Sequence, residues 1–242
     1  MDEVFDMSLN TDHYVVMSND LIKGKQRMGR KESKLLRLVI MQAVMEDKDF
    51  RTYKVDIKEL AKTLGVDSSN IYRETREICK NLLSNVVEIG DGNPKHKWKA
   101  FQWVSRCKYD GQGTLEIQLH DDLKPYLLGL GKWYTQYTCE SILHMNSVYA
   151  IRVYELIFME IKNRKIGNGV TVDLSVEMIR KACDCENKLK KISQFKEKVI
   201  DVSLREINAN TDFSISTEPY KKGKTIIGFK FLVNYKWNVE SN

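Results

Sequence analysis

The side chains best suited to chemistry in this sequence are polar and basic, and they recur on one side of an expected helix. Within the stretch DIKELAKTLGVDSSNIYRETREI, at residues 56–78, apolar residues at helical spacing define a buried side of the second helix. The opposite side presents hydroxyl, amide, guanidinium and ammonium groups, which hydrogen-bond to phosphates and base edges. These side chains are Ser69, Asn70, Arg73, Arg76 and Lys80. The pattern indicates DNA binding; the alternative is an ordinary helical hairpin with a solvated face.

The helices that position these side chains have recognisable ends. Asp56, followed three residues later by Glu59, predicts the capped start of a short helix. Gly65 suits the left-handed conformation that ends a helix, and Asp67 or Ser68 is expected to cap the next one. A small residue (Ala61), the turn glycine and an apolar wedge (Ile71) have the spacing of a helix-turn-helix.

Segments of period two follow this motif and predict strands at residues 86–89, 98–108 and 114–119. A helix-turn-helix followed by a hairpin with a basic tip is the order of a winged helix. The tip of the first hairpin contains Lys95, His96, Lys97 and Lys99. We expect Lys97 to reach phosphates or an adjacent groove; a solvated hairpin tip is the alternative.

The second half of the chain repeats this order, with a joint near residue 130. Asn146 is expected to cap a long helix, a strand covers 170–174, and Ser175 caps a short helix. A long helix at about 190–208 precedes strands at 213–218 and 226–237. The fold class predicted is therefore α+β, with two tandem winged-helix domains: residues 1–130, including an acidic leader at 1–20, and residues 131–242.

The second long helix begins with a cluster of lysines. Residues 188–198 contain five Lys and one Glu, and the N-terminus of a helix also carries the positive end of its dipole. We expect this end to enter a major groove. The side chains that avoid the apolar stripe are Lys190, Lys191, Gln194 and Lys198, and a second basic hairpin tip carries Lys221, Lys222 and Lys224. A lysine-rich solvated face is the alternative.

The composition supports a polyanionic partner and disfavours a secreted protein, a membrane protein and a phosphate-loop protein. The net charge is +6, concentrated in the two predicted domains behind the acidic leader. No segment resembles a signal peptide or a membrane span, and five cysteines without C-x-x-C spacing suit a reduced cytoplasmic protein. Gly223-Lys224-Thr225 fails as a phosphate loop because Glu218 occupies the position of the required glycine. We therefore expect no catalytic site, metal or cofactor.

Two segments resemble theta-type, iteron-binding plasmid replication initiators of the RepB/Rep_3 family. The first contains Tyr134-Thr135-Gln136-Tyr137 and the helix from Ser147 to Leu156. The second contains Phe195-Lys196, then Val199-Ile200, and then Glu206-Ile207-Asn208 with Thr211-Asp212. The resemblance is strongest over 121–237 and weaker, though collinear, over 14–120. Ser203 stands where the family usually has Ala, a small change at a packed position.

The resemblance implies two winged helices related by a pseudo-two-fold, without a cofactor or catalytic residue. It implies binding to direct repeats in a plasmid origin as a monomer, opening of the duplex, and recruitment of the host initiator and replicative helicase. A homodimer, joined largely through the first domain, would be in equilibrium with the DNA-bound monomer and would repress the initiator's own gene. Arg152 and Glu155 would then be structural. Each domain would place one helix in a major groove, about one helical turn (~10 bp) apart.

Two other functions fit parts of the sequence. A tandem winged-helix transcriptional regulator without an origin function would show the same motifs. A rolling-circle nicking enzyme would need a pair of His ligands for its metal and a nucleophilic Tyr. Tyrosines are plentiful, but the four His, at 13, 96, 120 and 144, are scattered and show no such pair.

Overall fold

Two three-stranded antiparallel sheets with the same strand connectivity organise the molecule. The computed structural model describes residues 13–67, 69–162, 164, 166 and 169–236, so most of the acidic leader and Ser68 lie outside it. The first sheet has the order β3-β7-β6 and the second the order β10-β11-β9. In each sheet the first strand along the chain pairs with the third, and the third pairs with the second. The strands are β3 (Tyr53–Asp56), β6 (Val104–Tyr109), β7 (Thr114–Leu119), β9 (Val170–Ser175), β10 (Phe213–Lys222) and β11 (Thr225–Tyr235).

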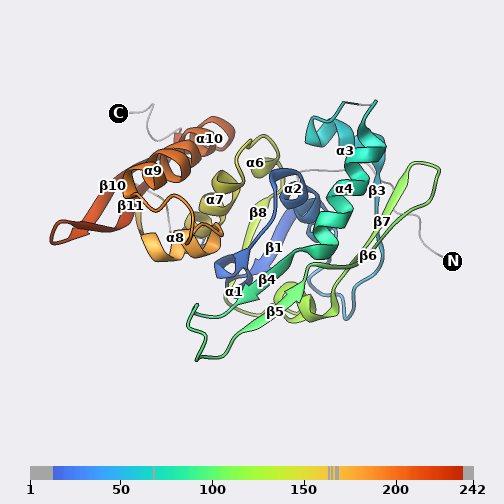
Figure 1. The fold of residues 1–242 in the computed structure, drawn as a ribbon, viewed down its shortest axis with the longest axis horizontal. Coiled ribbons are helices and arrows are strands. Elements are labelled where there is room, and N and C mark those ends of the chain that lie inside the picture. Colours follow the sequence, from blue (N-terminus) through green and yellow to red (C-terminus); the bar gives the residue numbers. More distant parts are fainter. Residues whose placement is uncertain (1–12, 68, 163, 165, 167–168, 237–242) are drawn as a thin grey trace.

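Helices occupy matching places around the two sheets (Figure 1). In the first unit α2 (Arg30–Ile40) precedes β3, and α3 (Ile57–Leu64) and α4 (Ile71–Ser84) lie between β3 and β6. In the second unit α7 (Val148–Ile161) precedes β9, and α8 (Val176–Ala182) is followed by a continuous helical stretch before β10. That stretch consists of α9 (Ile192–Phe195), the π-helical η2 (Lys196–Asp201) and α10 (Val202–Asn210). The doubled winged-helix prediction is confirmed.

The predicted ends of the first helix-turn-helix are partly correct. Asp56 caps α3 by accepting from the backbone N–H groups of Lys58 and Glu59, at 2.8 and 2.9 Å. Gly65 ends that helix with φ 64°, in the left-handed region. The second helix begins later than predicted, because its N-cap is Asn70. Asp67 instead accepts from the backbone N–H of Ser69 in the turn, at 2.8 Å.

Other predicted boundaries also shift. The apolar spacing over residues 30–47 predicts one long helix, but α2 ends at Ile40. Ser147, not Asn146, caps α7 by accepting from the N–H of Tyr149. The lysine-rich helix begins at Ile192, so Lys190 precedes it and Lys191 is its N-cap. The predicted end of the last strand at Trp237 lies outside the described residues.

The wing predicted for the first domain is wrong. The strands that flank its basic tip, β4 (Val86–Ile89) and β5 (Lys99–Gln102), form a separate sheet with β2 (Lys25–Gln26). The hairpin with the connectivity of β10–β11 is β6–β7, and its turn is Asp110-Gly111-Gln112-Gly113. The single strand expected at 98–108 is therefore two strands, separated at the fully buried Trp103.

Segments from both halves of the chain share one hydrophobic core. β1 (Tyr14–Ser18) pairs antiparallel with β8 (Tyr134–Thr138), and α1 (Asn19–Lys23) packs against α7 and α8. The connection between the units also contains η1 (Asp121–Leu123), α5 (Lys124–Leu127) and α6 (Glu140–Leu143). Packing of this kind fixes the two units against each other. Within the part of the chain that the structure describes, no helix has the length and apolar character that crossing a membrane requires.

Candidate nucleic-acid interface

The predicted contact residues of the first unit lie at the start and along one exposed side of α4. Arg73, Arg76 and Lys80 are exposed, whereas Thr75, Ile78 and Leu82 on the opposite side are buried. Ser69 is exposed in the turn, and Asn70 is half-buried at the N-cap. The helix therefore presents hydrogen-bond donors to solvent while its apolar side holds it to the core.

Local hydrogen bonds orient several of these side chains. Nη2 of Arg73 donates to Oδ1 of Asn70 at 3.0 Å. The hydroxyl and backbone N–H of Ser69 both donate to Asp67, which lowers the pKa of that carboxyl group. Lys80 is less available than its exposure suggests, because its ammonium group pairs with Glu77 at 2.9 Å. Arg76 forms no ion pair among the described residues and is the freer cation.

Tyr72 is an exposed residue of α4 that the sequence interpretation missed. Its side chain is 51% exposed, and its ring lies 5.7 Å from that of Tyr109 in the wing strand β6. Lys108, next to Tyr109, is also exposed and pairs only loosely with Glu116, at 3.7 Å. The signal was a large aromatic residue on the non-apolar side of the predicted helix. The true wing is thus in contact with the helix that carries the arginines.

In the second unit, the predicted residues surround the start of α9. Lys190 and Lys191 are exposed just before the helix, Gln194 is exposed on α9, and Lys198 is exposed on η2, which continues it. Lys198 pairs with the neighbouring Glu197 at 2.8 Å, and both side chains are largely exposed. Lys196 is half-buried instead. It pairs with Asp201, its ammonium nitrogen lying 2.6 and 2.9 Å from the two carboxylate oxygens.

Arg180 of α8 organises the loop that presents these lysines, and the sequence interpretation did not find it. Its guanidinium donates to the backbone carbonyl oxygens of Cys185, Lys188 and Leu189, at 3.1, 2.8 and 2.8 Å. The same group stacks over the ring of buried Phe195, 4.4 Å from its centroid. Leu189 has φ 50°, a conformation that a non-glycine residue rarely adopts without such support. A lone Arg in a predicted helix carried no signal of this role.

The basic hairpin tips differ in their relation to the winged helices. Lys221, Lys222 and Lys224 are exposed around the β10–β11 turn, where Gly223 has φ 61°. They therefore occupy the tip of the second wing, as predicted. Lys97 is exposed at the tip of β4–β5, outside either wing. The loop of that hairpin contacts the second unit where the chain leaves β4, because Lys181 of α8 donates to the carbonyl oxygen of Gly90.

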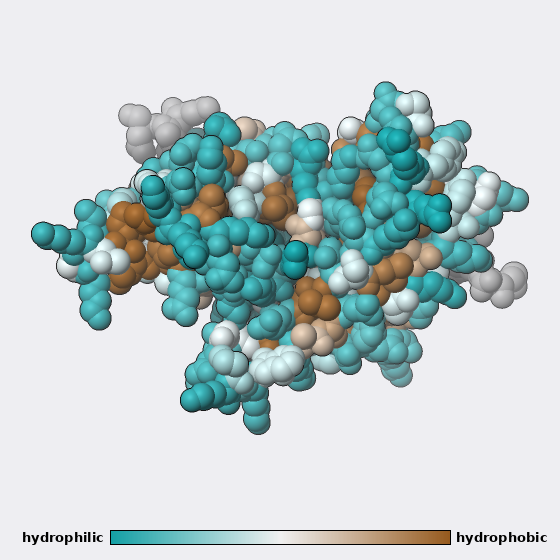
Figure 2. Space-filling view, in the orientation of Figure 1, coloured by the Kyte–Doolittle hydropathy of each residue, from teal (hydrophilic) through white to brown (hydrophobic). Residues whose placement is uncertain are grey.

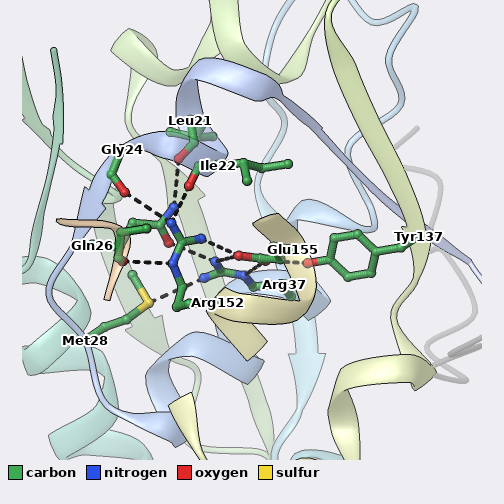
Figure 3. A network of polar contacts seen from close by, with 10 residues as sticks. Leu21, Ile22, Gly24, Gln26, Met28, Arg37, Tyr137, Arg152 and Glu155 are labelled. Atoms are coloured by element: carbon green, nitrogen blue, oxygen red, sulfur yellow. Dashed lines mark hydrogen bonds and ion pairs between the residues drawn. The ribbon is translucent and has the colours of Figure 1, made fainter. Parts of the chain in front are cut away.

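The two units meet at a buried network of charged side chains, seen from close by in Figure 3. The guanidinium of Arg37 in α2 donates twice to Glu155 in α7, at 3.0 and 3.2 Å. Tyr137 of β8 donates to the same carboxylate at 2.6 Å, and Arg152 forms a further ion pair with it. Arg152 also donates to the backbone carbonyl oxygens of Ile22, Gly24 and Ala182.

This network is structural in character. Burial disfavours ionisation of Glu155, but Arg37 and Arg152 outweigh that effect and lower its pKa. Burial, and then the negative charge of Glu155, raise the pKa of Tyr137 well above its ordinary value. The charges are thus balanced within the core and are closed to solvent. No cluster of three or more potential metal ligands occurs among the described residues.

The molecule places its two helix-turn-helix units apart along its long axis. Figure 1 shows α3 and α4 at one end and α9, β10 and β11 at the other, and Figure 2 shows a largely hydrophilic face between them. Two exposed helices, each preceded by a shorter helix and a connecting loop and accompanied by a hairpin, define a protein of two winged-helix domains.

The chain belongs to the Rep_3 family of plasmid replication initiators. The family model for the first winged helix of the initiator replication protein (WH1) matches residues 14–158, and that for the second (WH2) matches residues 175–233. The chain therefore carries the two winged-helix domains of this family, and its resemblance to the family is confirmed. The division at residue 130 stays a prediction.

Individual relatives are distant in sequence. A replication initiation protein of Escherichia coli is 21% identical over 215 residues, which cover 87% of this chain and 66% of the relative, just under two thirds of its length. An uncharacterised 27.6 kDa protein of Escherichia coli is 22% identical, over 85% of this chain and 89% of its own length. The crystal structure of the Pi initiator protein in complex with iteron DNA has a TM-score of 0.75 and 19% identity, and the match covers 94% of this chain and 99% of that one. This structural match supports the fold of two winged-helix domains.

Proposed function

We propose that this protein initiates plasmid replication by binding direct repeats in the origin, as a sequence-specific ligand of double-stranded DNA. The observation that carries the proposal is the doubling of one connectivity, in which each unit exposes polar and basic side chains at the start of its third helix. That end of a helix combines unpaired N–H groups with the positive end of the helix dipole. It enters a major groove in other helix-turn-helix proteins.

The side chains divide into two groups by chemistry. Asn70, Arg73, Arg76 and Gln194 carry groups that can form paired hydrogen bonds with base edges, so they are our candidates for reading sequence. Ser69 and the lysines are candidates for phosphate contacts, which give affinity without specificity. Lys190, Lys191 and Lys198 would flank the groove of the second unit. Lys221, Lys222 and Lys224 would follow the backbone or a minor groove, and Lys80 and Lys97 would make peripheral contacts.

Partners follow from the same proposal. The DNA-bound monomer would be in equilibrium with a homodimer joined largely through the first winged helix, and the dimer would repress the initiator's own gene. Recruitment of the host initiator and replicative helicase to the opened origin belongs to the proposal as well, as does action in the bacterial cytoplasm. The structurally similar Pi initiator was crystallised in complex with iteron DNA, which supports repeats as the DNA target here.

DNase footprinting on the replicon's own repeats tests the two-helix model. We expect two protected segments about one helical turn (~10 bp) apart on the same face of the duplex. Protection shorter than one turn would show that only one unit reads DNA. Replacing Gln194 with Ala should weaken protection at one segment, and replacing Asn70 with Ala at the other. Loss of both segments in either variant would contradict separate readers.

A plasmid maintenance assay separates initiation from transcriptional regulation. The protein is supplied from a second plasmid, and the test plasmid carries the origin with or without its direct repeats. We expect maintenance only when both the protein and the repeats are present. Maintenance of the test plasmid without the protein and the repeats, together with binding confined to one inverted repeat at a promoter, would favour a transcriptional regulator instead.

A further inference from the structure

The seam between α4 and β6 brings two cysteines together. Tyr72 and Cys79 are seven residues apart and lie on nearly the same side of α4, and Cys107 and Tyr109 are two apart on the same side of β6. The two elements pack against each other, and the tyrosine rings meet at 5.7 Å. The cysteines therefore face each other further along the seam. Consistent with this, each thiol shifts the pKa of the other.

The environments of the two thiols differ in a way that suits a two-step oxidation, in which one sulfur reacts first and the other then forms the disulfide. Cys79 is buried, whereas Cys107 is only half-buried and lies on β6, an edge strand of its sheet. The interaction between the two thiols lowers the pKa of Cys107 and, together with burial, raises that of Cys79. A thiolate, rather than a thiol, is the nucleophile in cysteine oxidation. Cys107 is thus the attacking sulfur, and Cys79 is positioned to resolve the product.

The other three cysteines provide a contrast within the same chain. Cys139, Cys183 and Cys185 are all buried. Burial raises the pKa of Cys139 to about 12 and that of Cys185 to about 11, and it also raises the pKa of Cys183. Such thiols have little thiolate character and restricted access, so they are poor targets for an oxidant.

We propose that Cys79 and Cys107 form a peroxide-reactive dithiol that closes into an intramolecular disulfide between α4 and β6. The Cys107 thiolate attacks one oxygen of hydrogen peroxide, the O–O bond breaks, and the departing hydroxide takes up a proton to become water. This leaves Cys107 as a sulfenic acid. The Cys79 sulfur then attacks the Cys107 sulfur, the S–O bond breaks, and the hydroxyl group leaves as water with the proton of Cys79. Two thiols lose two electrons in total, and one peroxide is reduced to two waters.

The disulfide would tie the helix that carries Arg73 and Arg76 to the first wing. This site is independent of the proposed replication function, because its chemistry requires no DNA.

Peptide mapping of the full-length, reduced protein after treatment with hydrogen peroxide tests the proposal. Unreacted thiols are blocked with N-ethylmaleimide in denaturant, and the products are analysed by mass spectrometry with and without dithiothreitol. We expect a monomer lighter by two hydrogens, a linked pair of peptides containing Cys79 and Cys107, and blocking of the other three cysteines. A Cys183–Cys185 link, an intermolecular link, or oxidation of the three buried thiols before Cys107 would overturn it.

Two variants keep the test independent of any one folding defect. Cys107→Ser should abolish the link, since it removes the attacking sulfur with almost no change of size. Cys79→Ala retains that sulfur but removes the resolving one, so Cys107 should accumulate as a sulfenic acid that dimedone traps. Absence of the dimedone adduct on Cys107 in a folded Cys79→Ala protein, or a dimedone adduct on Cys79 in Cys107→Ser, would refute the dithiol.

Discussion

Arg37 and Glu155 form a fully buried, two-point ion pair that joins the first helix of one winged-helix unit to the first helix of the other. The guanidinium of Arg37 lies 3.0 and 3.2 Å from the two carboxylate oxygens, and both side chains are 0% exposed. Two charges in such a place are stable only together, because removing one leaves the other without compensation. The pair therefore selects a packing of α2 against α7 in which both groups meet.

Removing the negative charge should destabilise the protein strongly. Glu155→Gln leaves Arg37 and Arg152 buried beside a neutral amide, and we expect it to lower the free energy of unfolding by about 3–5 kcal/mol at pH 7. Urea denaturation monitored by circular dichroism measures this. Glu160→Gln, on the same helix, removes an exposed pair with Arg164 at 3.6 Å and should change stability by only about 0.5 kcal/mol. Equal losses of unfolding free energy in the two variants would show that the buried ion pair contributes no more to stability than the exposed one.

The carboxyl group of Glu155 should also contribute to the loss of stability at acidic pH. Burial works against ionisation of Glu155, but the two arginines lower its pKa below the unfolded value of 4.5. Its stabilisation is therefore complete above the unfolded pKa and is lost as the pH falls through the lower, folded pKa. Wild-type stability should decline below about pH 4.5, and Glu155→Gln should show a shallower decline. Urea titrations between about pH 3 and 6 compare the slopes; parallel curves would contradict the assignment.

Features set by neighbouring residues were predictable from the sequence. Asp56, Gly65 and Ser175 mark helix ends through local hydrogen bonds or backbone conformation, and the doubled order of elements follows from periodicity. The exposed sides of α4 and α9 could be predicted for the same reason. The start of α9 at Ile192 could not, because it depends on Arg180 holding the carbonyl groups of the preceding loop.

Features set by pairing between distant segments were not predictable. The sequences of the two consecutive hairpins, β4–β5 and β6–β7, alternate equally well between apolar and polar residues. The true wing is the hairpin whose second strand pairs with β3, for example Ile117 with Tyr53. That pairing spans more than sixty residues and leaves no local mark. The role of Arg37 was missed for the same reason, since its partner Glu155 lies 118 positions away in the chain.

Arg180→Lys should impair the proposed DNA recognition by the second unit without unfolding it. A lysine keeps the charge but cannot donate to three carbonyl groups and stack on Phe195 at once, so the loop before α9 should lose its defined position. We expect weaker binding to origin repeats, with a smaller change for non-specific DNA, in fluorescence anisotropy titrations. Arg205→Lys, at an exposed position of α10, is the matched control. A loss of specific binding in the control alone would contradict the positioning role.

Lys191→Ala should weaken binding to all DNA sequences. As the exposed N-cap residue of α9, Lys191 is our candidate for a phosphate contact, so its loss should reduce the slope of log K against log salt by about one ion. Titrations at several salt concentrations measure that slope. Lys48→Ala removes an exposed charge from the loop between α2 and β3 and should leave it unchanged. An unaltered slope in Lys191→Ala would remove this residue from the proposed phosphate contacts.

Gly65→Ala isolates the contribution of backbone conformation to the first helix-turn-helix. An added methyl group would meet no atom within 4 Å, so any cost arises from the left-handed φ of 64° alone. We expect a loss of about 1–2 kcal/mol in the free energy of unfolding, because side chains disfavour that conformation. Gly131→Ala also adds a methyl group in open space but without a left-handed φ, and should be neutral or slightly stabilising. If urea denaturation gave the two variants equal stability, the turn between α3 and α4 would not require a glycine.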